Sequence, residues 1–142
     1  MSEYEYGNTW GRLILETALI AFIKANGNAR LMLCTRNLDT CEFMWKDKEF
    51  QYELTGFDGR CSRDNGNIAV VDLAIGECRS FNIDRVIAIK WFGEINSESG
   101  MEKAIEEYEK MKDDLEKDFG YTVSGGKAKE LTHSEFEGPI KF

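Results

Sequence analysis

One tight turn, Asn26-Gly27-Asn28, constrains the fold of this chain more than any other local feature. Glycine and asparagine tolerate the positive φ angles that a short β-hairpin turn requires. Apolar residues dominate the flanking segments, 17–25 and 29–35, and the first of these has apolar side chains on both of its strand faces. We therefore expect two antiparallel strands, the first of them in the centre of a sheet.

Further short strands are expected after this hairpin. Residues 41–54 predict a second hairpin that turns at Lys46-Asp47-Lys48, because the aromatic residues on each side of that turn share strand parity. Residues 67–74 and 86–92 are rich in β-branched residues and predict two strands, with a short strand at 78–81 between them. Regularly spaced short strands indicate an α+β protein built on a small antiparallel β-barrel or sheet.

Helices are expected before and after the strands. Residues 8–16 begin with the cap residue Asn8 and predict a short helix. Ser99 and Glu102 form a capping-box pattern, and apolar residues then recur at intervals of three and four until Gly120, which is expected to end the helix. This spacing predicts an acidic amphipathic helix. Its apolar stripe consists of Met101, Ala104, Tyr108, Met111 and Leu115.

The apolar stripe must be buried, and two arrangements would bury it. The helix either packs on the barrel of its own chain or forms the interface of a homo-oligomer, a dimer or higher. The interface residues would be Met101, Tyr108, Met111 and Leu115. The predicted organisation is a β-barrel domain with its N-terminal helix at 1–95, the amphipathic helix at 96–120, and a flexible C-terminal arm at 121–142.

Length and composition limit the class of protein. The chain of 142 residues suits one domain, and its longest apolar run, Ala18–Ile23, is far too short to span a membrane. Because the acidic N-terminus also lacks the features of a signal peptide, we expect a cytoplasmic protein without membrane contact. The four cysteines lack the paired spacing of a zinc site, so we expect no metal and no cofactor. They are Cys34, Cys41, Cys61 and Cys78.

Catalytic motifs are absent from the sequence. The only histidine, His133, falls in the predicted arm, and no phosphate-binding glycine loop or HExxH motif is present. Asp58 and Asp64 form a carboxylate pair that could act in acid–base chemistry, although exposed aspartates in a loop explain them equally. We therefore expect a binding protein without catalytic residues.

Arginine is confined to one part of this acidic chain. The net charge is −8, yet all seven arginines lie within residues 1–95, and residues 96–142 carry only lysine as basic residues. Either this distribution is chance, or the barrel needs the planar, bidentate donors that suit phosphates and carboxylates. The acidic balance disfavours duplex DNA as a partner.

The turn near residues 79–85 carries the densest group of candidate ligand contacts. Phe81 could stack a base, Asn82 could bind its edge, and the arginines could hold a phosphate. A structural interpretation is equally open: Phe81 and Ile83 fill the barrel, and Arg85 pairs with a nearby aspartate, Asp84 or Asp72. Two arginines of the early hairpin would add positive charge. The candidate ligand-binding residues are Arg30, Arg36, Arg79, Phe81, Asn82 and Arg85.

Two stretches resemble small barrel proteins. Arg79-Ser-Phe81, with the run Asp84-Arg85-Val86-Ile-Ala-Ile, resembles the closing strands of WYL-like and SH3-like barrels. The Asn26-Gly27-Asn28 turn, followed by Arg30-Leu-Met-Leu-Cys34-Thr-Arg36, resembles small barrel proteins encoded by bacteriophages. These resemblances cover roughly residues 17–92. WYL-like domains are regulatory sensors of ligands or nucleic acids, so the resemblance implies binding without chemistry.

The overall layout carries a second resemblance. A strand-rich front with a C-terminal helix is similar to the Thoeris anti-defence sponge proteins of phages, which sequester cyclic ADP-ribose-type signals at subunit interfaces. This resemblance implies a phage protein in the host cytoplasm that captures a nucleotide-derived signal and so blocks anti-phage defence.

Two other functions stay open at this point. The acidic helix, with eight acidic residues against four lysines between Glu102 and Asp118, would suit a protein–protein inhibitor or a modulator of host transcription. A single-strand nucleic-acid binder would use Trp45, Tyr52 and Phe57 to stack bases, although the net charge opposes that function.

Overall fold

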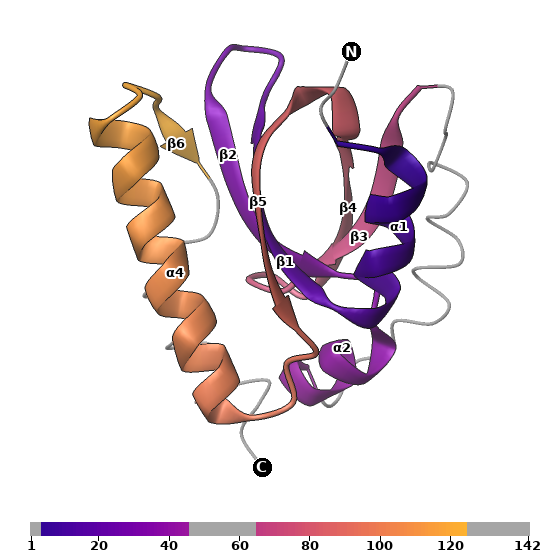
Figure 1. Ribbon diagram of the computed structural model, residues 1–142. Coiled ribbons are helices and arrows are strands. Elements are labelled where there is room, and N and C mark those ends of the chain that lie inside the picture. Colours follow the sequence, from indigo (N-terminus) through magenta and orange to yellow (C-terminus); the bar gives the residue numbers. More distant parts are fainter. Residues whose placement is uncertain (1–3, 46–64, 125–142) are drawn as a thin grey trace.

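A curled sheet lies between two helices in the computed structural model of the chain, with α1 on one side and α4 on the other (Figure 1). The structure describes residues 4–45 and 65–124. The elements in chain order are α1 (Tyr6–Leu15), β1 (Thr17–Ile23), β2 (Ala29–Thr35), α2 (Leu38–Met44), β3 (Asn67–Asp72), β4 (Glu77–Asn82), the 3₁₀ turn η2 (Ile83–Arg85), β5 (Val86–Gly93), α4 (Glu98–Lys117) and β6 (Val123–Ser124).

Five antiparallel strands form the main sheet in the order β4-β3-β2-β1-β5, and the short β6 pairs in parallel with β2. The outer strands β4 and β5 do not pair with each other in the described part of the chain. The α+β class is therefore confirmed, whereas the closed barrel is corrected to an open sheet. The expected hairpin is present, with Ile23 opposite Ala29 and Gly27 at φ +87° in the turn.

The open sheet curls strongly enough to bring distant strands together. The rings of Phe22 in β1 and Phe81 in β4 lie 6.1 Å apart, although two strands separate β1 from β4. In a flat sheet, strands three positions apart would be separated by roughly 14 Å. The curl thus creates an inner face, which α1 covers in part. Its buried side chains are Leu13, Ala18, Ile20, Met32, Cys34, Ile68, Val70, Phe81, Ile83 and Val86.

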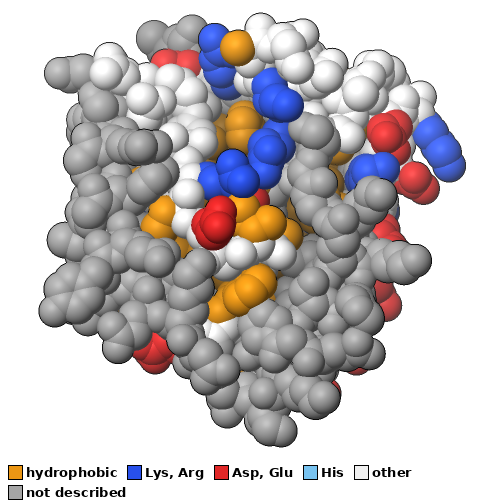
Figure 2. Space-filling model, turned by 180° about the vertical axis from the view of Figure 1, so that it is seen from behind, with side chains coloured by type: hydrophobic (Ala, Val, Ile, Leu, Met, Phe, Trp, Pro, Cys, Tyr) orange, Lys and Arg blue, Asp and Glu red, His pale blue; other side chains and the backbone are white. Residues whose placement is uncertain are grey.

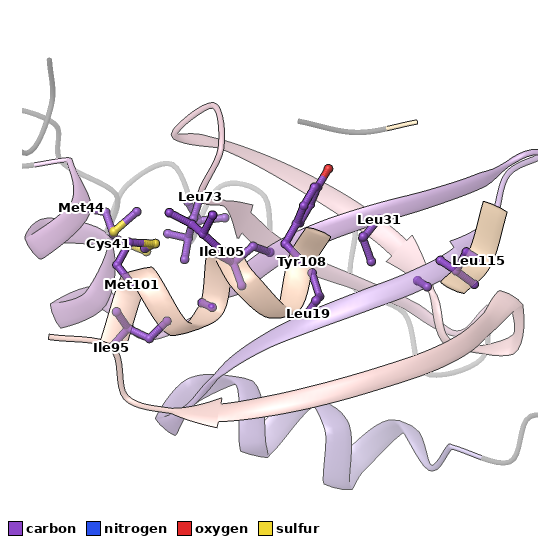
Figure 3. Close-up of a cluster of buried hydrophobic side chains, with 14 residues drawn as sticks. Leu19, Leu31, Cys41, Met44, Leu73, Ile95, Met101, Ile105, Tyr108 and Leu115 are labelled. Carbon is purple, nitrogen blue, oxygen red and sulfur yellow. The ribbon is translucent and has the colours of Figure 1, made fainter. Parts of the chain in front are cut away.

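The opposite, outer face of the sheet packs against α4 (Figure 3). Tyr108 and Leu115 of the helix share a buried cluster with Leu19 and Leu31 of the two central strands. Met101 is 0% exposed, and Met111 packs against the same cluster. The apolar stripe therefore packs on the chain's own sheet, and these side chains are occupied within one chain. A homo-oligomer stays a prediction.

Both flanking helices are confirmed with shifted boundaries. The side chain of Ser97, rather than Ser99, caps α4 by accepting the Gly100 N–H at 3.2 Å, and the helix ends at Lys117. Glu5 caps α1 by accepting two backbone N–H groups at 3.0 Å, so the helix begins before the expected cap residue Asn8. No helix of the described segments combines the length and apolar character needed to cross a membrane.

The strand expected around residues 41–45 is wrong, because Leu38–Met44 form the helix α2. Asn37 caps this helix by accepting the N–H groups of Asp39 and Thr40 at 2.9 and 3.3 Å. The capping bonds favour the helix locally, and the burial of Cys41 and Met44 in the outer cluster fixes its position. The predicted turn at 46–48 and nearly all of the predicted arm lie outside the described residues.

Candidate functional site

The sheet divides where β2 and β3 stop pairing. Only Cys34 and Thr35 of β2 are in register with β3, whereas Ala29 and Arg30 pair with β6. The hairpin of β1 and β2 and the pair of β3 and β4 therefore form the two arms of a fork. A hollow of about 350 Å³ lies between the arms. We call it the first hollow; its lining residues are Phe22, Lys24, Arg30, Met32, Cys78, Arg79 and Ser80.

Strand alternation aims two arginines at this hollow. In β2, Arg30 alternates with the outer-face residues Ala29 and Leu31, and it lies directly opposite Phe22 of β1. In β4, Arg79 shares strand parity with the inner-face residue Phe81. Seen from behind, basic side chains gather in a row beside hydrophobic side chains on a hollowed part of the surface (Figure 2).

A buried carboxylate holds both arginines. Asp72 Oδ2 lies 3.4 Å from Arg30 Nη2 and 3.7 Å from Arg79 Nε, and the Asp72 side chain is 3% exposed. The Ala74 N–H donates to its other oxygen at 3.0 Å. Burial raises the pKa of Asp72, and these hydrogen bonds and positive charges counteract the rise only in part. One carboxylate faces two guanidinium groups, so even the ionised site keeps an excess of positive charge.

A second hollow, of about 270 Å³, continues from the first. Both are lined by Phe22, Lys24 and Ser80, so we treat them as one groove. The second hollow adds Asn82 and Arg85 to the lining, at the start and end of η2. Four basic side chains therefore surround the groove: Lys24, Arg30, Arg79 and Arg85.

The amide of Asn82 organises the far end of the groove. Its Oδ1 accepts the Asp84 N–H at 2.9 Å and thereby caps η2. Its Nδ2 donates to the Asn65 carbonyl at 2.7 Å and to Asn67 Oδ1 at 3.1 Å. These bonds hold η2 against the start of β3, and so they position Arg85 at the groove.

The structure brings together most of the residues that the sequence proposed. Arg30 and Arg79 line the first hollow, and Asn82 and Arg85 line the second. Phe81 also borders the second hollow, but it is 3% exposed and packs in the inner cluster. Its ring therefore offers almost no surface on which a base could stack.

Arg36 lies away from the groove and ties α1 to the sheet. Its side chain donates to the Ala69 carbonyl, and its guanidinium carbon lies 4.9 Å from the Trp10 ring centre. Arg36 is 6% exposed, and its backbone N–H donates to the Leu13 carbonyl at 2.8 Å. The charge-neutralising role proposed for Arg36 has no geometric support, because its guanidinium is buried between structural partners.

Sequence reasoning missed Phe22 and Lys24. Phe22 lies near the end of β1 and Lys24 follows directly after the strand, two residues on and beside the hairpin turn. The sequence alone shows that positions 22 and 24 would share one face of a strand. It does not show their approach to β4, because that depends on the curl of the sheet. Phe22, which is half-buried, supplies the aromatic surface that Phe81 does not.

The cysteines of the described residues are mostly buried. Burial raises the pKa of Cys34 well above its ordinary value and raises that of Cys41 to about 12, where the neighbouring Cys78 adds to the rise. Within residues 4–45 and 65–124, no three His, Cys, Asp or Glu side chains cluster as metal ligands would. Cys61, His133, the Asp58–Asp64 pair and two of the proposed stacking residues, Tyr52 and Phe57, lie outside the described residues.

No protein-family model, curated protein or solved structure gives a significant match to this chain.

Proposed function

We propose that this protein binds a small nucleotide-type anion in the groove and holds it without transforming it. The observation that carries the proposal is the convergence of Lys24, Arg30, Arg79 and Arg85 on one groove in a chain of net charge −8. A basic groove on an acidic protein favours small anions, because the surrounding acidic surface repels extended polyanions such as duplex DNA.

The chemistry of the lining fits a phosphorylated nucleoside. Guanidinium groups donate paired hydrogen bonds to phosphate oxygens, and Asp72 fixes the orientation of two of them. The Phe22 ring offers an apolar surface for a base or sugar, and the Ser80 hydroxyl offers a donor and an acceptor. A hollow of this size accommodates a ligand of nucleotide size.

In its biological form, the proposal is that a phage protein in the host cytoplasm sequesters a cyclic ADP-ribose-type signal and so blocks anti-phage defence. Support comes from the groove chemistry and from the similarity in layout to Thoeris anti-defence sponges. We also propose kinship with SH3-like barrels: the Phe22–Phe81 contact supports a sheet that curls as a barrel does but stays open. A homo-oligomer belongs to the same proposal, and light scattering would test it.

Isothermal titration calorimetry tests the binding proposal directly. We expect heat of binding from at least one compound among the cyclic ADP-ribose isomers and cyclic dinucleotides. Arg79→Gln should weaken that binding by about tenfold or more, since a lost charged hydrogen bond costs about 1.5–3 kcal/mol. Arg12→Gln is the matched control, because Arg12 stacks on Trp91 and lines neither hollow. Absence of heat from every compound would contradict the proposal.

The solvent face of α4 favours a second candidate function, inhibition of a host protein or modulation of host transcription. Its exposed residues include Glu102, Glu106, Glu109 and Asp113, whereas its apolar stripe faces the sheet. Removing α4 would expose the outer cluster, so charge reversal is the suitable test. In a pull-down from host lysate, this function predicts a stoichiometric partner that is lost with Glu102→Lys/Glu109→Lys and kept with Arg79→Gln.

A further inference from the structure

We propose that the groove selects a ligand with two separated anionic groups, such as a cyclic dinucleotide, over a ligand with one. This inference rests on the proposed nucleotide binding, and within that proposal it favours a cyclic dinucleotide over a cyclic ADP-ribose-type ligand, whose two phosphates form a pyrophosphate. It comes from the arrangement of the groove, in which two hollows with different arginines share a middle of three residues: Phe22, Lys24 and Ser80.

The two ends of the groove are anchored at opposite ends of β3. Asp72, the last residue of this strand, holds Arg30 and Arg79 at 3.4 and 3.7 Å. Asn67, the first residue, accepts from Asn82 at 3.1 Å, next to the turn that carries Arg85. The two anchors are five residue steps apart along an extended strand, so their Cα atoms are separated by roughly 17 Å.

This separation argues against a single phosphate as the whole anionic part of the ligand. The two phosphorus atoms of a pyrophosphate share one bridging oxygen, so a pyrophosphate would occupy one end only. In a cyclic dinucleotide, by contrast, sugars separate the two phosphates. The ring keeps the two phosphates closer together than the two anchors, so the long side chains of Arg79 and Arg85 would reach inward along the groove to contact one phosphate each.

The middle of the groove suits the uncharged part of such a ligand. Phe22 is half-buried and contacts Phe81 at 6.1 Å between ring centres, so its position is fixed by the inner cluster. Aromatic side chains stack bases without sequence preference. Lys24 and Ser80 border the ring on either side of the fork and can reach polar atoms of a base or sugar. The order along the groove is thus anion site, apolar platform, anion site.

The experiment compares two probes that share a base and differ in the number of phosphates: cyclic di-AMP and 3′,5′-cyclic AMP. Calorimetry is performed on the wild-type protein, on Arg79→Gln and Arg85→Gln as variants of the two ends, and on Arg12→Gln as the control. Thermal unfolding checks that each variant is folded. We expect cyclic di-AMP to bind at least about tenfold more tightly than cyclic AMP, because a second anion site adds charged hydrogen bonds.

The variants separate the ends. Arg79→Gln and Arg85→Gln should each lower the affinity for cyclic di-AMP by about tenfold or more. At most one of the two should lower the affinity for cyclic AMP. Arg12→Gln should leave both affinities unchanged. Two outcomes would overturn the two-anion inference while leaving nucleotide binding intact. The first is equal affinity for the two probes, and the second is an affinity for cyclic di-AMP that Arg85→Gln does not change. Binding of a cyclic ADP-ribose isomer without binding of cyclic di-AMP would also overturn only the two-anion inference. If no nucleotide binds, both proposals are overturned.

Discussion

The outer and inner faces of the sheet are made from the same strands, yet they differ in how their polar groups are distributed. On the outer face, alternate residues of β1 and β2, such as Leu19 and Leu31, pack in a hydrophobic cluster with residues of α4 and α2. On the inner face, Met32 lies in the apolar cluster, but Arg30, two residues earlier on the same face, lies at the fork beside a buried carboxylate.

The difference follows from strand pairing. The inner face becomes polar at the last paired residues, where Asp72 of β3 lies opposite Cys34 of β2 and contacts Arg30 and Arg79 at the edge of the first hollow. Beyond these residues β6 replaces β3 as the neighbour of β2, and the two hollows lie between the β1–β2 hairpin and β4. We conclude that the outer face carries most of the apolar packing, and we propose that the fork on the inner face is the ligand site.

The largest expected effect comes from a truncation in the outer cluster. Leu19 is 0% exposed on a central strand, so Leu19→Ala should lower the free energy of unfolding by about 2–5 kcal/mol through lost burial and a cavity. Leu15, which is 68% exposed, is the control, and Leu15→Ala should change stability by less than about 0.5 kcal/mol. Urea unfolding measures both. Equal effects would contradict the assignment of stability to this face.

A smaller effect is expected at the turn that joins β3 to β4. Gly76 has φ +66°, and a Cβ there would meet ring atoms of Trp45 at 2.6–2.9 Å. Gly76→Ala should therefore cost about 2–4 kcal/mol, from the left-handed backbone and from displacement of the indole. Gly93 also has a positive φ, but nothing lies within 4 Å of its Cβ position, so Gly93→Ala should cost about 1–2 kcal/mol. Similar unfolding midpoints for the two variants would exclude the clash.

The buried carboxylate predicts a pH dependence at the fork. Because burial raises the pKa of Asp72, the folded protein binds this proton more tightly than the unfolded chain does. The corresponding stability is complete below the ordinary pKa of 3.8 and is lost as the pH rises through the higher folded value. The unfolding free energy of the wild type relative to Asp72→Asn should therefore fall between pH 4 and 7. Urea unfolding at several pH values measures this difference in unfolding free energy. A difference that rises with pH would contradict the prediction.

The smallest effect concerns thiol reactivity. Since burial raises the pKa of Cys34 and raises that of Cys41 to about 12, neither thiol should react with iodoacetamide at pH 8 in the folded protein. Mass spectrometry should find these two cysteines modified only after unfolding in urea. Modification at equal rates in both states would show that the core opens more readily than its packing implies.

Local signals in the sequence predicted much of this fold. The Asn26-Gly27-Asn28 hairpin, α1 and α4 follow from turn chemistry and from apolar periodicity, which act within a few residues. The helix α2 was missed because the parity of Phe43 and Trp45 suggested a strand. Asn37 before an acidic first turn, with Cys41 and Met44 three residues apart, was the overlooked signal.

The groove was predictable only in part. Arg30, Arg79 and Arg85 stand out in the sequence because arginine is confined to the strand-rich region. Which arginines converge depends on the curl and the fork, and neither leaves a local signal. The same nonlocal packing buries Phe81 and Arg36, whose side-chain chemistry alone had suggested ligand contacts.

The central claim is that the fork on the inner face, and not the α4 face, binds a nucleotide-type anion. The most direct test is a titration of ¹⁵N-labelled protein with cyclic di-AMP and cyclic ADP-ribose isomers, followed by amide chemical shifts. We predict saturable shifts at residues 22–24, 30–32 and 78–85 with at least one ligand, and unchanged amides at 101–115. Shifts confined to 101–115, or no shifts with any ligand, would contradict the claim.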